Sequence, residues 1–296
     1  MRLMSRTFGI FAWILFLSST AGARDGARRA LIVVGLPGDL AHEALFRETA
    51  GRWKNWMIQG LGFRSTDVRI LSGRPEAPGF GDGPATRESV AAEVADLCKK
   101  VEPDDRVWVF VLGHANLDEG HAFLHLPGPD LRDDEFAALF RGLVAKEQVF
   151  WMTNPASGAF LGPLSARGRI VIASTERSGE VNETEFPVAL AEVVGRPTDK
   201  LDRDRDGKVS ILEVFLATVE SVEARFQADK RAPTEHAQLD DDGDGVGSEL
   251  PGDPRISKPD GVLASATFLP VVAVPPPPTP SSRSPHGTDR VTPSSR

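Results

Sequence analysis

A run of six apolar residues, Val107 to Leu112, constrains the fold more than any other stretch of the chain. The run is rich in β-branched and aromatic side chains, and Gly113 follows it directly. A strand that is apolar at every position is buried on both faces, which is typical of a parallel sheet covered by helices. The run therefore predicts an α/β protein.

Shorter apolar runs and helical patterns alternate along the rest of the chain. Further strands are predicted over residues 30–36, 68–71, 149–153 and 170–174, with a short hairpin over 122–126. Helices are predicted over residues 41–59, 86–101, 133–145 and 185–194. This alternation implies a mostly parallel sheet with helices on both faces. Ligands in such folds bind beyond the carboxyl ends of the strands, which here carry His114 and residues 154–158.

An acidic stretch after these elements matches the twelve-residue calcium loop of an EF-hand. Its three aspartates can converge on one cation, and Gly207 at the sixth loop position permits the sharp turn. The predicted ligands of a Ca²⁺ ion are Asp202, Asp204, Asp206, the backbone carbonyl of Lys208, Ser210 and Glu213. The alternative interpretation is a solvated acidic turn that precedes a helix.

The two sides of this loop differ in helical pattern. Residues 212–226 carry apolar side chains at three- and four-residue steps, which predicts a helix that docks on the α/β body. Before the loop, Gly195 and Pro197 interrupt the chain. Any helix that enters the loop is therefore expected to be short or irregular.

A second acidic cluster reproduces the first half of such a loop. Its second half departs from the pattern, because the closing position falls on Pro251 and the nearest carboxylate belongs to Glu249. The weaker second metal site predicted here comprises Asp240, Asp242, Asp244, Val246 and Glu249. An acidic surface loop without a metal is the alternative.

Composition divides the chain into five expected segments. A basic start, an apolar run from Phe8 to Leu17 and a small-residue site at Ala21 to Ala23 predict a secretory signal peptide. The run is shorter than the roughly 20 residues that cross a bilayer, so no membrane anchor is expected and the mature protein should be secreted or periplasmic. The segments are a signal peptide (1–23), an α/β domain (24–195), a calcium-binding segment (196–255), an ordered extension (256–274) and a disordered Pro- and Ser-rich tail (275–296).

Charge and cysteine content exclude two possibilities. The net charge of −8 becomes −10 once residues 1–23 are removed, and such acidity argues against nucleic acid as a partner. Cys98 is the only cysteine, so no intrachain disulfide can form. It lies on the apolar stripe of a predicted helix, where a buried core thiol is expected rather than a nucleophile.

The stretches around His114 and residues 149–158 resemble the caspase-fold cysteine peptidases, in particular their legumain-like branch. In that family a His-Gly pair ends one central strand, and the nucleophilic Cys ends the next strand. Here Ala115 stands in place of that Gly, and Pro155 occupies the position of the nucleophile. The resemblance implies a caspase-like fold and a peptidase that has lost its usual nucleophile.

Three functions are compatible with these features. The first is a secreted calcium-binding protein whose α/β domain is catalytically inactive and serves as a binding or structural module. The second is an active hydrolase that pairs His114 with Ser157, although displacing a nucleophile by two residues usually destroys its geometry. The third is a scaffold that captures a peptide or protein in the vestigial cleft, which a bulky substitution at Gly158 should block.

Overall fold

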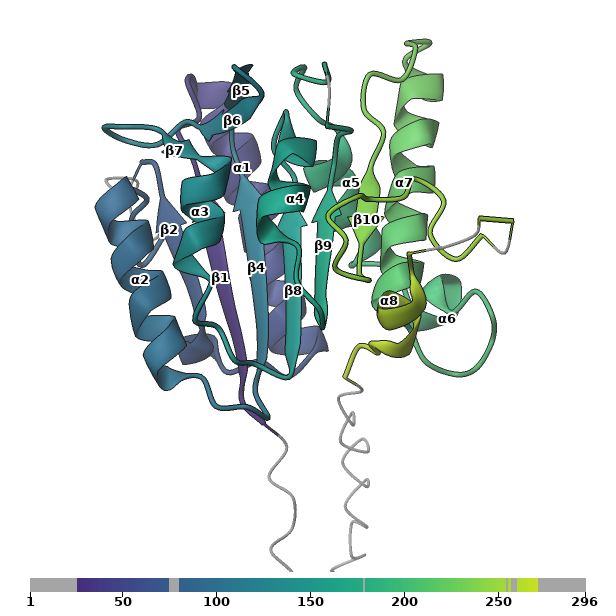
Figure 1. Ribbon diagram of the computed structural model, residues 1–296. Coiled ribbons are helices and arrows are strands. Elements are labelled where there is room, and N and C mark those ends of the chain that lie inside the picture. Colours follow the sequence, from purple (N-terminus) through teal and green to yellow (C-terminus); the bar gives the residue numbers. More distant parts are fainter. Residues whose placement is uncertain (1–25, 75–79, 178, 254, 257–259, 271–296) are drawn as a thin grey trace, which may run out of the picture.

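Seven strands form the central sheet of the protein (Figure 1), and the computed structural model describes residues 26–74, 80–177, 179–253, 255–256 and 260–270. The strands are β1 (Arg28–Val34), β2 (Val68–Ser72), β3 (Gly83–Pro84), β4 (Arg106–Leu112), β8 (Glu147–Met152), β9 (Arg169–Ala173) and β10 (Gln238–Asp240). Their order is β10-β9-β8-β4-β1-β2-β3. Among these described strands only β10 is antiparallel to its neighbour, so the predicted α/β class with a mostly parallel sheet is confirmed.

Helices cover both faces of this sheet. In Figure 1, α2, α3 and α4 lie on one face and α1 on the other, while α7 stands beside α5 near the β10 edge. The bounds are α1 (Leu40–Asn55), α2 (Arg87–Lys100), α3 (Asp133–Leu139), α4 (Leu161–Leu164), α5 (Phe186–Val193), α6 (Thr198–Leu201), α7 (Ile211–Ala228) and α8 (Val262–Ala266). A small antiparallel sheet of β5 (Ala115–Asp118), β6 (His121–Leu124) and β7 (Leu131–Arg132) lies above β4.

Strand β4 shows why the chain needs continuously apolar strands. Trp108 and Phe110 pack into the core under α1, α5 and α7, whereas Val107 and Val109 pack into the core under α2, α3 and α4. Successive side chains of a strand point to opposite faces, so a strand between two helical layers has no solvent-facing position. All four side chains are fully buried.

Several elements differ from the predicted pattern. The helix expected over 133–145 ends at Leu139, and the chain then turns while Leu143 still packs into the core. The expected hairpin is part of the three-stranded sheet described above. The helix expected over 41–59 is α-helical only as far as Asn55 and finishes in a π-helical turn, Trp56–Gly60.

The segment after residue 195 packs against the α/β body as one continuous core. Phe215 and Val222 of α7 belong to the same apolar cluster as Phe186 and Leu190 of α5. Strand β10 extends the sheet by pairing with β9. The expected signal peptide and tail lie outside the described residues, as do residues 257–259 and 271–274 of the expected extension. No helix within the described ranges is long and apolar enough to cross a membrane.

Glu235 comes from this later segment and covers the amino end of α5. The residue is 5% exposed, and its carboxylate accepts hydrogen bonds from the backbone N–H groups of Glu185 and Phe186, at 2.7 and 3.4 Å. Burial raises the pKa of Glu235 to about 7, although the two N–H groups act in the opposite direction. The protonated form therefore favours the folded state, and the native protein loses stability as the pH rises from the unfolded pKa of 4.5 through 7.

A Glu235→Gln variant tests this coupling. Glutamine stays neutral, so we expect the variant to be more stable than the wild type at pH 8 by on the order of 2 kcal/mol, and of similar stability near pH 4.5. Urea unfolding at both pH values measures the difference. Glu223→Gln, on the exposed side of α7, is the matched control and should change stability little. Parallel pH profiles for wild type and Glu235→Gln would contradict the assignment.

Candidate functional site

The first acidic loop brings its three aspartates together. Carboxylate oxygens of Asp202, Asp204 and Asp206 lie within 4.8 Å of one another. The Asp206 N–H group donates to Asp202 and Asp204 at 3.1 and 3.0 Å, and Gly207 N–H donates to Asp202 at 3.0 Å. Gly207 has φ of 85°, a conformation that glycine adopts without steric cost. The loop thus has the sharp turn and the convergent oxygens that its sequence predicts.

Glu213 lies in the first turn of α7, and the residue is 8% exposed. One oxygen accepts hydrogen bonds from the backbone and hydroxyl of Ser210, at 2.7 and 2.9 Å, and Ser210 in turn caps the helix. The other oxygen accepts the N–H group of Arg203 at 2.6 Å. Glu213 is therefore held against the loop. Each carboxylate oxygen has two lone pairs, so the oxygen that accepts the hydrogen bond from Arg203 keeps one lone pair free.

The loop is also anchored on its far side by a short antiparallel pairing. Leu269 N–H donates to the Val209 carbonyl at 2.8 Å, and Ile211 N–H donates to the Thr267 carbonyl at 2.9 Å. The Lys208 ammonium lies 4.5 Å from the ring centre of Phe268. The helix that enters the loop is α6, which has only four residues, so the pairing with residues 267–269 adds to its support.

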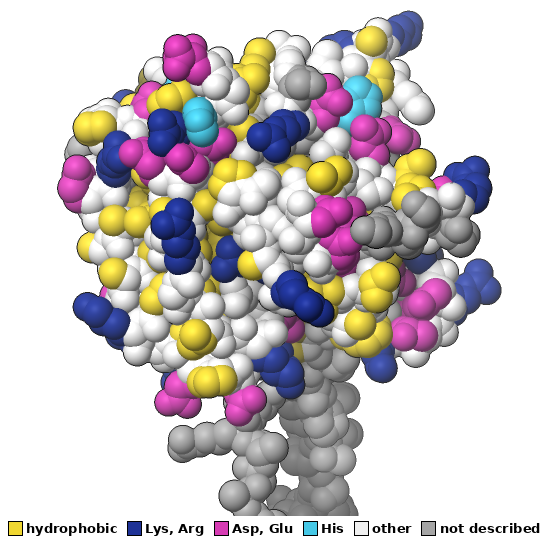
Figure 2. All heavy atoms as spheres, viewed as in Figure 1, with side chains coloured by type: hydrophobic (Ala, Val, Ile, Leu, Met, Phe, Trp, Pro, Cys, Tyr) yellow, Lys and Arg dark blue, Asp and Glu magenta, His cyan; other side chains and the backbone are white. Residues whose placement is uncertain are grey.

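The second acidic loop gathers a carboxylate that sequence spacing did not suggest. Oxygens of Asp240, Asp242 and Asp260 lie within 4.8 Å of one another, and Asp244 and Glu249 are not part of this group. The Gly243 and Gly245 N–H groups both donate to Asp240 at 3.1 Å. Figure 2 shows acidic side chains gathered on the side of the molecule where this loop and the α6–α7 loop lie.

Asp260 lies beside the loop because Asp241, within the loop, forms hydrogen bonds with the segment 260–264. Asp241 accepts the N–H groups of Gly261 and Ala264 at 2.8 and 2.7 Å, and its own N–H donates to Asp260 at 3.2 Å. Burial, and then repulsion from Asp240, Asp241 and Asp242, raise the pKa of Asp260 to about 7, although its hydrogen bond from Asp241 acts in the opposite direction. Burial also raises the pKa of Asp240. These carboxylates are crowded in a way that a cation would relieve.

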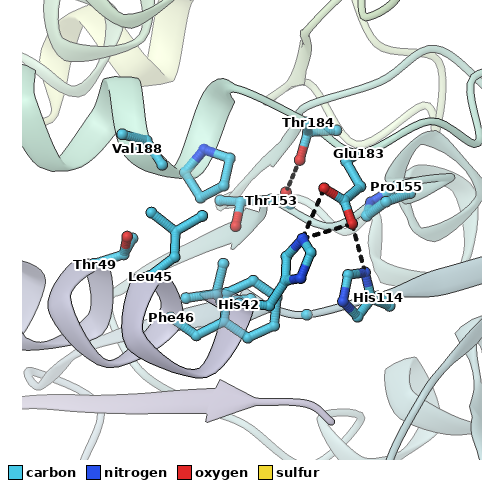
Figure 3. A pocket seen from close by; sticks show the side chains of 13 residues that line it. His42, Leu45, Phe46, Thr49, His114, Thr153, Pro155, Glu183, Thr184 and Val188 are labelled. Atoms are coloured by element: carbon cyan, nitrogen blue, oxygen red, sulfur yellow. Dashed lines mark hydrogen bonds and ion pairs between the residues drawn. The ribbon is translucent and has the colours of Figure 1, made fainter. Parts of the chain in front are cut away.

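His114 follows β4 and borders a pocket at the carboxyl edge of the sheet (Figure 3). Its Nε2 atom lies 3.0 Å from the Pro37 carbonyl oxygen, and its Nδ1 atom lies 3.4 Å from the carboxylate of Glu183. Apolar side chains make much of the pocket wall, with Leu45, Phe46, Pro155, Pro187 and Val188 among them.

Neither Pro155, where the resemblance places the nucleophile, nor Ser157 offers a nucleophile to His114. Pro155 lines the pocket, and the described residues that line it include no Cys or Ser. Ser157 is fully buried, and its hydroxyl is bonded to the hydroxyls of Ser174 and Thr175 and to the Thr175 N–H group, at 3.0 to 3.1 Å. This geometry does not support the alternative in which Ser157 works with His114.

Cys98 lies on α2 and packs against the apolar core on the sheet face opposite α1. It is partly buried rather than fully buried as expected, and burial raises the pKa of its thiol. A raised pKa lowers the fraction of thiolate, the form that attacks substrates. The thiol therefore packs against the core and is poorly suited to act as a nucleophile.

Two pocket residues escaped the sequence analysis. His42, in the first turn of α1, directs Nε2 at the carboxylate of Glu183, which comes from the loop between β9 and α5, at 2.9 to 3.0 Å. This carboxylate, and then that of Asp39, raise the pKa of His42, with desolvation acting in the opposite direction. Single polar residues at distant places in the sequence give no motif, so only the fold brings them together.

Comparison with solved structures gives many matches, among them a caspase. The structure is similar to caspase-1 from Spodoptera frugiperda, with 13% sequence identity and a TM-score of 0.46, over 74% of this chain and 87% of that chain. No protein-family model and no curated protein matches the chain. At this TM-score and identity the likeness carries no argument about activity or substrate.

Proposed function

We propose that the protein is a secreted calcium-binding protein, in which Ca²⁺ fixes the later part of the chain against a catalytically inactive, caspase-like α/β body. The observation that carries this proposal is the loop over residues 202–213. It combines a full EF-hand pattern in sequence with three convergent carboxylates and a closing Glu213 held against the loop. Calcium suits this donor set because it prefers six to eight oxygen ligands in a flexible arrangement.

The place of the loop supports a role in stability. Val209 and Ile211 pair with the segment that follows α8, and α7 packs on α5 through the shared core. A cation that binds the folded loop and not the unfolded chain stabilises the fold by mass action. Binding would therefore stabilise the sheet body as well as the loop.

A second, weaker Ca²⁺ site is proposed in the loop that follows β10. The cluster of Asp240, Asp242 and Asp260 supports it, because negative charges crowd there and Asp260 already has a raised pKa. In this assignment Asp260 takes the closing place that spacing gave to Glu249, and Asp244 remains a neighbour rather than a member of the cluster.

The inactive character of the body rests on the pocket beside His114. Pro155 has no nucleophilic atom, and Ser157 is enclosed by other hydroxyls. The pocket could still hold a peptide or protein segment, as the scaffold function suggests. A legumain-like ancestry fits the placement of His114 and Pro155 and belongs to the same proposal.

Calcium titration of the mature chain tests the proposal. At about 100 times its Kd, one bound Ca²⁺ stabilises the fold by about 2.7 kcal/mol, which corresponds to a rise in Tm of roughly 5–10 °C. A double variant, Asp204→Ala with Asp206→Ala, should lose the tighter binding event and most of this rise. Calorimetry should count two ions in the wild type, and one after Asp242→Ala.

The matched control is Asp199→Ala. Asp199 lies in α6 just before the loop and is exposed, so its removal takes away a nearby negative charge without removing a loop carboxylate. It should bind calcium like the wild type. Identical melting curves of the wild type with and without calcium would refute the proposed function.

A further inference from the structure

The pocket at the carboxyl edge of the sheet contains a second kind of donor set. Oxygen and nitrogen atoms of His42, His114 and Glu183 lie within 4.8 Å of one another. The three residues come from α1, from the end of β4 and from the loop before α5. Figure 3 shows both imidazole rings directed at the same carboxylate.

The distances in this group match those around a tetrahedral metal. Glu183 oxygens lie 2.9 to 3.0 Å from His42 Nε2 and 3.4 Å from His114 Nδ1. Zinc bonds of about 2.0–2.1 Å to His and carboxylate ligands, arranged tetrahedrally, separate neighbouring ligand atoms by about 3.3 Å. The side chains therefore need only small movements to share one ion.

The other nitrogen of each imidazole also lies near an oxygen atom. His114 Nε2 is 3.0 Å from the Pro37 carbonyl oxygen, which can only accept, so Nε2 carries the proton. His42 Nδ1 lies 2.9 Å from a carboxylate oxygen of Asp39, but without the alignment of a hydrogen bond. Without a metal, His42 Nε2 donates to the Glu183 carboxylate, and a bound ion would take the place of that proton. Metal-binding histidines are oriented by carbonyl partners such as the one that Pro37 offers His114.

We propose that His42, His114 and Glu183 form a binding site for Zn²⁺ or a related divalent transition metal. Two imidazoles and one carboxylate leave the fourth tetrahedral position open toward the apolar pocket, where water or a small ligand can bind. The ion would replace the direct contacts between the rings and the carboxylate. The assignment is independent of the calcium proposal, because the two donor sets share no residue.

A competing cluster is less suited to a metal. His121 Nδ1 lies 2.7 Å from Asp133, and Asp134 completes this group. The Asp134 carboxylate is already engaged by two nitrogens of Arg132, at 2.6 and 2.7 Å. An arginine partner neutralises the charge that would attract the ion. His121→Gln is therefore a matched control for the pocket histidines.

The test is Zn²⁺ titration of the full mature chain in saturating Ca²⁺, which keeps the acidic loops filled. One Zn²⁺ should bind, and Co²⁺ in its place should give the absorption bands of a tetrahedral complex. His114→Gln and Glu183→Gln should each weaken Zn²⁺ binding at least about 100-fold, since even the loss of an outer partner costs roughly 10–100-fold. Asp39→Asn keeps a residue that can cap α1 and should weaken binding about 10-fold.

Glu183 is more than half exposed, so its substitution should leave the fold intact, and circular dichroism verifies this. His121→Gln should bind Zn²⁺ like the wild type. The proposal is overturned if the folded wild type binds no Zn²⁺, in which case the three residues form a hydrogen-bonded cluster only. It is overturned equally if His121→Gln loses binding while His114→Gln and Glu183→Gln retain it.

Discussion

Replacing Glu213 with alanine is expected to lower both the calcium affinity and the calcium-free stability of the protein. Its carboxylate accepts the N–H groups of Arg203 and Ser210, and the shortened side chain leaves both without that acceptor. Loss of the capping contact and of a buried acceptor should cost about 2 kcal/mol. Loss of the closing ligand should weaken Ca²⁺ binding at least about 100-fold, equivalent to about 2.7 kcal/mol.

A Glu213→Gln variant separates the two effects. Glutamine keeps one acceptor oxygen and serves in capping boxes, but it lacks the negative charge and the second oxygen. Its calcium-free Tm should lie much closer to that of the wild type, while its Ca²⁺ affinity should fall as in Glu213→Ala. Thermal unfolding and calorimetry, each with and without Ca²⁺, measure the pair. Wild-type calcium affinity in Glu213→Ala would remove Glu213 from the ligand set.

The second large effect concerns Gly158, which follows the pocket residue Pro155. A Cβ atom at Gly158 would lie 2.3 to 2.5 Å from backbone atoms of Glu176 and Arg177. Backbone cannot move aside as a flexible side chain can, so the strain falls on the turn and on the buried hydroxyls of Ser157 and Thr175. We expect Gly158→Ala to destabilise the protein by about 3 kcal/mol, measured by urea unfolding.

Gly51→Ala is the control for this substitution. Gly51 lies within α1, and a Cβ atom added there would meet no neighbouring side chain or distant backbone within 4 Å. Alanine there should stabilise the protein by about 0.5–1 kcal/mol, because glycine costs conformational entropy in a helix. Equal stabilities for the two variants would show that the turn after β8 yields more easily than its contacts imply. A bulky residue at Gly158 therefore breaks the fold rather than blocking a cleft.

Structural features that depend on residues close together in the sequence could be predicted. The buried strands follow from short apolar runs such as Val107 to Leu112, and the turn of the 202–213 loop follows from Gly207 among three aspartates. Short elements were missed, because β10 and α8 have three and five residues and no periodic pattern. The early end of α3 was missed because Leu143 continues the apolar spacing although the chain there has turned.

Features assembled by the fold could not be predicted in this way. Asp260 joins the second acidic cluster only because Asp241 binds the backbone at Gly261 and Ala264. His42 and Glu183 meet His114 because parallel strands bring the loops at their carboxyl ends to one edge. Ser157 was a candidate because it lies two residues after Pro155 in the sequence. The turn at Ala156, with φ of 56°, places Ser157 in the interior.

The antiparallel strand β10 has a consequence for any shortened form of the protein. It pairs with Val171, Ile172 and Ala173 of β9 and so closes that border of the sheet. A chain cut after residue 195 would expose the backbone N–H and C=O groups of these three residues, whose apolar side chains are buried in the full chain. Exposed edge strands of this kind pair with strands of other molecules. We expect such a truncated chain to self-associate, so the α/β body has to be produced together with the segment that carries β10.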